Sequence, residues 1–365
     1  MGDEMLGFSR FWVVALALCL GAAGFAKPAA SQQDFYKGKT IRVIIGYGTG
    51  GGYDSYARLL TKHMGKHIPG NPTVVPQNMP GAGSTAAANH IFNVAPKDGT
   101  AFGTFARGLA LSSLIDPNNK SVKFQAEKFT WIGSSSSYKN DAYLLLVRSD
   151  MPIKTVDDLR GPNAKQMILA ATNAGSTSYD VPIQLLEVLG LKLKIINGYP
   201  DGAAMSLAVQ RKEVDGRMIG LSAISATQPD WLGDKGFMRP LLQFARRTRH
   251  QLVPNIPMAR ELATGPENAA LIELLEMPFF LARPYAAPPG VPAERAAILV
   301  KAFMETHTDK DYLADAKKQK MDISPIDGGE IRDMLVRMTN IPPDVINHYL
   351  AIAAKTKPEG EAASE

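Results

Sequence analysis

The sequence predicts an α/β protein built from two domains. Apolar, β-branched segments alternate with helical patterns along most of the 365 residues, an order typical of sheets that contain parallel strands. Two of the strand-to-helix turns, at 46–52 and 78–84, are rich in glycine. The chain is also longer than a single hydrophobic core usually supports. These observations favour two α/β domains, each with a mainly parallel sheet.

Residues 1–26 are expected to form a signal peptide. Arg10 precedes the apolar run 11–25, and Ala26 offers a small residue for cleavage. The run is shorter than the about 20 apolar residues that span a bilayer. Cys19 is the only cysteine, so we expect neither disulfides nor cysteine metal sites in the mature chain. The expected product is an exported protein.

The first β–α unit carries the most informative motif. Ile41–Ile45 is typical of a buried strand; glycines follow between 46 and 52, and a helical pattern begins at Asp54. Glycine lets the backbone come close to a ligand, and the first amides of a helix have no intrahelical acceptor. The turn therefore predicts a main-chain site for a carboxylate or phosphate.

The second β–α unit repeats this arrangement. Val74–Pro76 is a short predicted strand, the glycine-rich turn follows, and an alanine-rich helix is expected over Thr85–Val94 with Ser84 as its cap. The carboxyl ends of parallel strands meet at one edge of a sheet. We therefore expect the two turns to converge on one ligand.

The remaining elements continue the alternation. The predicted strands are 100–105, 129–133, 142–147, 167–171, 192–196, 215–219, 240–244 and 278–283, with a helix opened by Thr155, a helix ended by Gly190, and helices over 203–210, 293–307 and 329–338. Arg107 follows one of these strands and Arg217 lies within another, so both are candidate counter-charges for a second carboxylate.

Other kinds of site fit the sequence poorly. The first turn satisfies G-x-G-x-x-G, but a dinucleotide site needs an acidic residue about 20 positions on, and the next strand ends in 76–78 without one. G-x-S-x-G is absent, which disfavours a serine hydrolase, although a triad assembled in space stays open.

His63 and His67 lie four apart, but no Glu follows His63, and a basic exposed helix face is favoured over a metal site. The net charge of +5 is spread along the chain and does not indicate nucleic-acid binding. We expect no catalytic residue, no metal and no cofactor.

A series of short motifs, taken in order, resembles one family. The motifs are Phe35-Tyr36-Lys37-Gly38-Lys39, the glycine-rich turn ending in Asp54, Ala57-Arg58, Asn78-x-Pro80-Gly81-Ala82-Gly83, Ala95-Pro96-Lys97-Asp98-Gly99-Thr100, Ala174-Gly175, Gly198-Tyr199-x-x-Gly202, Pro254-x-Ile256-Pro257 and Ala287-Pro288-x-Gly290-Val291-Pro292. Together they cover most of the mature chain. Their order and spacing resemble the Bug (TctC-like) family, the periplasmic solute receptors of tripartite tricarboxylate transporters.

The resemblance implies a two-lobed periplasmic binding protein of the type II-like, Venus flytrap kind, with its ligand cleft between the lobes. The implied division is 36–137 plus 251–352 for lobe 1, 138–250 for lobe 2, and a disordered tail over 353–365. Crossovers near 138–145 and 245–256 would act as hinges. The resemblance also implies a periplasmic location, no covalent chemistry, a small carboxylate ligand, and the membrane subunits of a tripartite tricarboxylate-type transporter as partners; we expect a monomer.

The expected ligand-binding residues come from both lobes. They are Gly48, Thr49, Gly50, Gly51 and Asp54 of the first turn, Pro80, Gly81, Ala82, Gly83 and Ser84 of the second turn, Gly175, Ser176, Thr177 and Tyr199 of lobe 2, and the two arginines Arg107 and Arg217. The chain departs from the family pattern where Met79 replaces a frequent Arg and Ile219-Gly220 replaces a frequent Asp-Asn pair. The lobe 2 contacts and the identity of the carboxylate therefore stay open. A ligand-sensing protein that feeds a signalling partner, or an exported hydrolase, are the alternatives.

Overall fold

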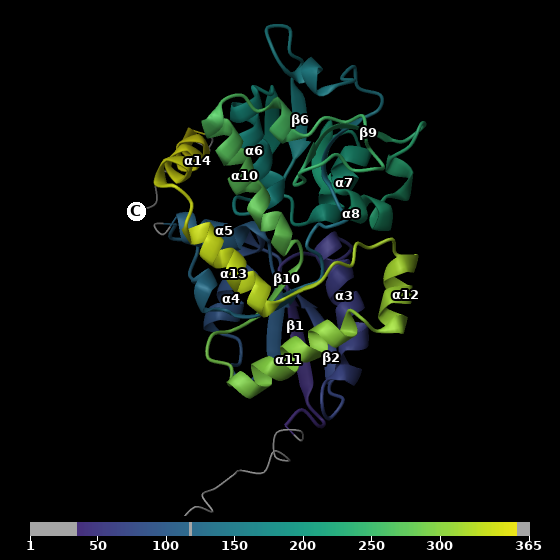
Figure 1. The fold of residues 1–365 in the computed structure, drawn as a ribbon. Coiled ribbons are helices and arrows are strands. Elements are labelled where there is room, and N and C mark those ends of the chain that lie inside the picture. The colour runs from purple at the N-terminus through teal and green to yellow at the C-terminus, as the bar shows by residue number, and fades with distance from the viewer. Residues whose placement is uncertain (1–34, 117–118, 356–365) are drawn as a thin grey trace, which may run out of the picture.

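The chain folds into two α/β lobes, one above the other in Figure 1, in a computed structural model that describes residues 35–116 and 119–355. The expected signal peptide, including Cys19, and nearly all of the expected tail lie outside these residues. Within the described ranges, no helix combines the length and the apolar character needed to cross a membrane.

The first lobe is built on a six-stranded sheet with the order β11-β4-β10-β3-β1-β2. Its strands are β1 (Thr40–Ile45), β2 (Thr73–Asn78), β3 (Ala101–Thr104), β4 (Thr130–Ser134), β10 (Pro284–Ala287) and β11 (Ile326–Asp327), and its helices are α3 (Gly52–Met64), α4 (Thr85–Asn93), α5 (Gly108–Ile115), α11 (Ala293–Thr306), α12 (Lys310–Lys318) and α13 (Gly328–Thr339). One face of the sheet buries Val43 and Ile45 of β1 against Phe303 of α11. The predicted buried strand is confirmed.

The second lobe is built on a five-stranded sheet with the order β7-β6-β8-β5-β9. Its strands are β5 (Tyr143–Arg148), β6 (Met167–Ala170), β7 (Leu193–Ile196), β8 (Gly216–Gly220) and β9 (Met238–Phe244), with helices α6 (Thr177–Leu189), α7 (Gly202–Gln210), α8 (Leu221–Thr227), α9 (Ala259–Leu262), α10 (Pro266–Glu276) and α14 (Pro343–Lys355). Short 3₁₀ helices complete the two lobes: η1 (Gly65–His67), η2 (Ala82–Ser84), η3 (Ala126–Lys128), η4 (Val156–Leu159), η5 (Pro229–Trp231) and η6 (Met277–Leu281).

Both sheets are mixed rather than mainly parallel. β1 runs parallel to β2 and β3, and β6 runs parallel to β7 and β8. β10 is antiparallel to β3 and β4, and β5 is antiparallel to β8 and β9. β5 and β10 are the strands that enter their sheets from the other lobe. Since they enter at the edge where the parallel strands end, they must run the opposite way.

The chain crosses between the lobes at 135–142, at 277–283 and at 340–342. The first crossover lies near the predicted position, but the second does not lie at 245–256. Those residues fold back along β9, where the Gln243 side chain donates hydrogen bonds to the carbonyl oxygens of Val253 and Ile256. The predicted strand at 278–283 is also wrong, because its first half is the 3₁₀ helix η6, which begins at Met277 with a proline in its first turn. Phe279 of η6 packs against the rings of Tyr138, Tyr143 and Phe244.

The first two crossovers lie side by side and are hydrogen-bonded to each other. The Ser135 amide donates to the Arg283 carbonyl and the Ala282 amide donates to the Ser136 carbonyl, each at 3.1 Å, while the Arg283 amide donates to Ser134 Oγ at 2.9 Å. These crossovers form one paired strap between the lobes.

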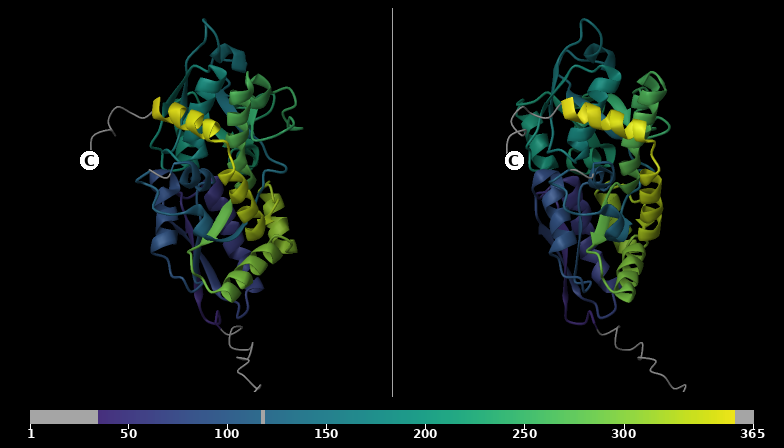
Figure 2. Two further views of the ribbon diagram at one scale, coloured as in Figure 1. Left: turned by 60° about the vertical axis from the view of Figure 1, so that its left-hand side comes forward. Right: turned by 90° about the vertical axis from the view of Figure 1, so that its left-hand side faces the viewer.

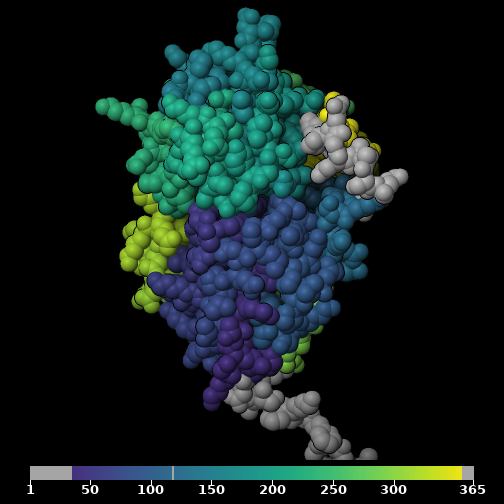
Figure 3. All heavy atoms as spheres, turned by 180° about the vertical axis from the view of Figure 1, so that it is seen from behind, coloured from purple at the N-terminus to yellow at the C-terminus, as the bar shows by residue number. Residues whose placement is uncertain are grey.

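The C-terminal region divides between the lobes differently from the expected division. α14 packs against α6 and α10, so α10 and α14 lie with the second sheet, although the expected division placed 251–352 in lobe 1. α13 lies beside the first lobe and α14 lies across the second (Figure 2). From behind, the two lobes meet along a broad seam (Figure 3). We assign α10 and α14 to lobe 2 on these contacts.

Candidate functional site

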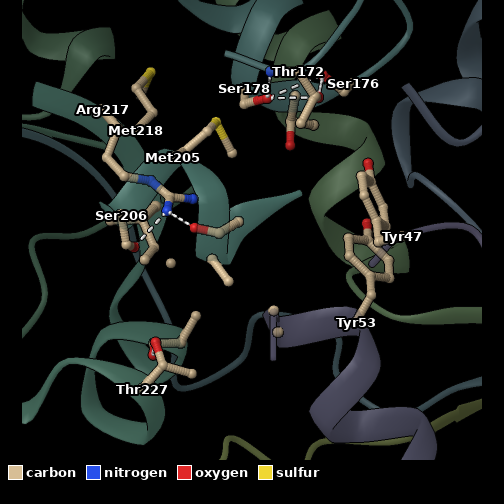
Figure 4. A pocket seen from close by; sticks show the side chains of 18 of the residues that line it. Tyr47, Tyr53, Thr172, Ser176, Ser178, Met205, Ser206, Arg217, Met218 and Thr227 are labelled. Carbon is tan, nitrogen blue, oxygen red and sulfur yellow. Dashed lines mark hydrogen bonds between the residues drawn. The ribbon is translucent and has the colours of Figure 1, made fainter. Parts of the chain in front are cut away.

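A cavity of about 200 Å³ lies between the lobes. Its wall includes the start of α3 in the first lobe, the starts of α6 and α7 in the second, and β8 (Figure 4). Tyr47 and Tyr53 form one side, with ring centroids 4.7 Å apart in a stacked arrangement. The first amides of α3 and α6 have no intrahelical acceptors and carry the positive ends of their helix dipoles. The start of α7 is capped by Asp201, which accepts a hydrogen bond from the Ala204 amide. The main chain around the cavity therefore favours an anion.

The first glycine-rich turn reaches this cavity, but Asp54 does not line it. The Asp54 carboxylate instead accepts hydrogen bonds from the Gly50 amide, Arg58 Nε and Asn78 Nδ2, each at 2.9 Å. Burial acts to raise the pKa of Asp54, but the hydrogen bonds from Arg58, Asn78 and Gly50 outweigh it and hold the pKa below its usual value. Through its hydrogen bond with the Gly50 amide, Asp54 stabilises the conformation of the turn.

The second glycine-rich turn lies at the seam between the lobes and not at the cavity. A Cβ atom added to Gly83 would lie 2.8 Å from the Ala174 carbonyl oxygen of lobe 2. Ser84 does not cap α4 as predicted, because it has a left-handed φ of 84° and makes no side-chain cap. Its Oγ accepts a hydrogen bond from the Ala106 amide at 3.1 Å instead. The turn places backbone against backbone across the seam.

Hydroxyl groups from lobe 2 gather at one end of the cavity. Thr172 Oγ1 lies 2.5 Å from Ser176 Oγ and 3.0 Å from Ser178 Oγ, and Ser176 Oγ also donates to the Asn173 carbonyl (Figure 4). This cluster is built by the turn between β6 and α6. The three hydroxyl groups are hydrogen-bonded to one another.

Three buried arginines line the cavity, each from a different part of the chain. Arg107 follows β3, Arg217 lies in β8, and Arg283 lies in the second crossover. All three are 5% exposed or less. Arg107 donates from its amide and its Nε to the Tyr53 hydroxyl, at 3.0 and 3.4 Å, and its guanidinium lies 4.6 Å from the Phe279 ring centroid.

Arg217 and Arg283 are held mainly by neutral groups. Arg217 Nη1 donates to Ser206 Oγ at 2.8 Å and to the Gly202 carbonyl (Figure 4). Arg283 Nη1 donates to the Ala282 carbonyl at 2.8 Å, and its guanidinium lies over the Tyr53 ring. Burial lowers the pKa of Arg217 to about 10, which leaves it charged at neutral pH.

The cavity lining holds no counter-charge for this trio. The acids that act on it electrostatically, Asp201 on Arg217 and Asp141 on Arg283, lie outside the lining. Among the described residues that line the cavity there is no Asp or Glu. Arg107 Nη1, Arg217 Nε and Arg283 Nε are buried without a hydrogen-bond partner in the described part of the chain. Buried charges are ordinarily paired, because an unpaired one is strongly disfavoured. The cavity therefore has the electrostatics of an anion site.

The structure brings together some of the expected site residues and separates others. Those lining the cavity are Gly50, Gly51, Arg107, Ser176, Thr177 and Arg217. Those outside its lining are Gly48, Thr49, Asp54, Pro80, Gly81, Ala82, Gly83, Ser84, Gly175 and Tyr199. Sequence reasoning missed Arg283, because it lay in a segment predicted to be a strand. An arginine embedded in the apolar run 277–287 was the available signal.

His63 of α3 and His67 of η1 face α12 and its N-cap residue. His63 Nε2 lies 3.0 Å from Asp315 Oδ2, and His67 Nε2 lies 3.3 Å from Asp309 Oδ2. The prediction of an exposed face is therefore wrong for His63, which is only 8% exposed. Within residues 35–116 and 119–355, no group of three or more His, Cys, Asp or Glu side chains is placed to hold a metal ion.

Comparison with known proteins connects this geometry to one fold. No protein-family model matches the sequence. A UPF0065 protein from the gbd 5′ region of Cupriavidus necator is 27% identical over 267 residues, which cover 70% of this chain and 74% of that protein.

Several solved structures match both lobes. The periplasmic binding protein BugD aligns with a TM-score of 0.67 at 18% identity, over 87% of this chain and 99% of BugD. This chain has the Bug-type periplasmic binding protein fold. MatC of Rhodopseudomonas palustris with bound malate aligns with a TM-score of 0.61 at 21% identity, over 86% of this chain and 98% of MatC. The resemblance indicated by the sequence motifs and the two-lobed α/β fold class are confirmed.

In this Bug-type fold, the seam between the lobes contains a titratable group. Asp180 at the start of α6 accepts a hydrogen bond from the Gly175 amide at 3.1 Å, and a Cβ atom added to Gly108 of lobe 1 would lie 3.9 Å from its Oδ2. Burial raises the pKa of Asp180 to about 7. The folded chain therefore binds a proton here that the unfolded chain, with an ordinary Asp, releases near pH 4.

We expect Asp180→Asn to remove a pH dependence of stability. A raised carboxyl pKa stabilises the fold fully below about pH 4, and that stabilisation is lost as the pH rises through 7. Because Asp180 is only half-buried by area, the loss should be about 1–2 kcal/mol. Urea unfolding at pH 4.5 and pH 8 measures it: the variant should gain stability over the parent at pH 8 and little at pH 4.5. An equal difference at both pH values would contradict the assignment.

Proposed function

We propose that this protein is a periplasmic receptor that captures a small carboxylate and delivers it to the membrane subunits of a tripartite tricarboxylate-type transporter. One observation carries the proposal: three buried guanidinium groups line an inter-lobe cavity that has no acidic side chain. A bound polycarboxylate would supply the missing counter-charges through charge-assisted, bidentate hydrogen bonds.

The size and position of the cavity support this function. A volume of about 200 Å³ is smaller than the roughly 300–1,000 Å³ of sites for drug-sized ligands. The wall comes from both lobes, so a ligand held there contacts both and favours their closed arrangement. MatC, which shares the fold, was solved with malate. Binding and release by lobe movement require no covalent chemistry, so we propose that the protein is not an enzyme. We also propose that it acts as a monomer.

A thermal-shift screen with di- and tricarboxylates tests this function. A ligand that binds only the folded state stabilises it by about 2.7 kcal/mol at a concentration 100 times its Kd, so the melting temperature should rise with the matching acid. The dimethyl ester of the same acid is the matched control, because it keeps the carbon frame and loses the charge. No rise with any carboxylate would contradict the receptor function.

Measured uptake separates transport from sensing. Deleting the gene should abolish uptake of the acid that stabilises the protein, if the protein serves a transporter. A protein that only senses the acid would bind it equally well. Its deletion would leave uptake of the acid intact, provided that the transporter for that acid is still expressed.

A further inference from the structure

We propose that the preferred ligand carries at least two carboxylates on a frame without hydroxyl or amino substituents. This inference rests on the proposed function and narrows its ligand class. It depends on which hydrogen-bonding groups of the cavity wall are already engaged within the protein and which are free.

The cationic groups form two poles. Arg107 and Arg283 both contact Tyr53, the first through the tyrosine hydroxyl and the second across the ring, so they mark one side of the cavity. Arg217 extends from β8 on the opposite lobe and is anchored by Ser206 of α7. In Figure 4, Arg217 and the Tyr47–Tyr53 pair lie on opposite sides of the cavity. Two separated poles fit a ligand with an acid group at each end.

Most of the neutral hydroxyl groups that lobe 2 contributes to the wall are engaged within the protein. Thr172, Ser176 and Ser178 bond among themselves. Three other polar side chains are also engaged: Ser206 accepts from Arg217, Gln210 donates to Gln228, and Thr227 donates to the Ala223 carbonyl. Of the side-chain nitrogens buried in the wall, those left without a partner are guanidinium groups.

Apolar side chains also line the cavity. Met205, Met218, Ile219 and Ala223 line it, and the stacked rings of Tyr47 and Tyr53 face it from the first lobe. A ligand hydroxyl placed against these apolar side chains loses its water and gains no hydrogen bond from them, which costs affinity. A ligand ammonium group meets three positive charges and no carboxylate, which costs more.

Matched pairs of acids that differ in one group test this inference. The pairs are succinate with malate, tricarballylate with citrate, and glutarate with glutamate, measured by calorimetry on the purified protein at pH 7.5 and constant ionic strength. We expect each hydroxyl to weaken binding about tenfold, and the amino group to weaken it about a hundredfold or more.

The outcomes separate this inference from the proposed function. If acids bind but malate equals or exceeds succinate, or glutamate equals or exceeds glutarate, the ligand class is wrong while the receptor function stands. If none of the six acids binds while another carboxylate of the thermal-shift screen does, the inference fails and the receptor function stands; if no carboxylate of the screen binds, both fail. Tighter binding of the unsubstituted member in all three pairs supports both.

Discussion

Replacing Arg217 with methionine should abolish tight dicarboxylate binding while leaving the protein folded and more stable without ligand. Methionine keeps the unbranched stem of the arginine as far as the position of Nε, so the variant removes the charge and the hydrogen-bond donors of the guanidinium. Arg217 is 5% exposed and faces a wall without acids. Removing a buried charge of this kind relieves its desolvation, and we expect a gain of about 1–3 kcal/mol in the free energy of unfolding. The Gly202 carbonyl and Ser206 hydroxyl that it leaves line the cavity and can bind water.

The loss of binding should be large, because one acid group of the ligand would lose its charge-assisted partner. Truncating one member of a buried charge pair typically costs about 2–5 kcal/mol, which corresponds to a loss in affinity of about 30-fold or more. Calorimetry and denaturant unfolding measure the two effects. Arg211→Met is the matched control in the same lobe, since the Arg211 side chain is 64% exposed. Unchanged affinity in Arg217→Met would place the ligand elsewhere.

Replacing Gly83 with leucine should prevent the lobes from reaching the arrangement seen here. The new Cβ would lie 2.8 Å from the Ala174 carbonyl and 2.9 Å from the Asn173 carbonyl, and both are backbone atoms of the opposite lobe that have no alternative rotamer. The clash exists only when the lobes are together. We expect at least a tenfold loss of ligand affinity and a larger radius of gyration in small-angle scattering with ligand present.

Gly161→Leu supplies the matched control for backbone strain. Gly83 and Gly161 both have a left-handed φ, of +62° and +80°, but a Cβ at Gly161 meets nothing within 4 Å. Both variants should lose similar stability from the strained backbone. Only the Gly83 variant should lose ligand affinity, and equal affinities in the two variants would show that the seam does not close on binding.

The parts of the fold set by local pattern were predictable from the sequence. The apolar run at Ile41–Ile45, its glycine turn and the following helix are short-range features, and the structure contains each of them. The run Met277–Leu281 was mistaken for a strand because its apolar residues suit either a strand or a buried 3₁₀ turn. What decides between the two is the aromatic cluster around Phe279, assembled from residues far apart in the chain.

The candidate site was predictable only in part, for a similar reason. A glycine-rich turn after a strand indicates an anion site from local sequence alone, and Gly50 and Gly51 do line the cavity. Whether an arginine is buried without a carboxylate depends on its spatial neighbours, so Arg107 and Arg217 could be proposed as candidates but Arg283 was overlooked. Asp54 shows the converse: its place beside the turn suggested ligand contact, yet its oxygens are taken by Arg58, Asn78 and Gly50.

The third connection between the lobes, at 340–342, limits how they can move. Two adjacent segments such as the paired strap form a pivot about which a body can bend and also twist. The link from α13 to α14 joins the lobes at a separate place, and α14 is fastened to α6 and α10. A body held at two separated points rotates about the line that joins them and loses its freedom to twist. We expect the two lobes to open by rotation about this single axis.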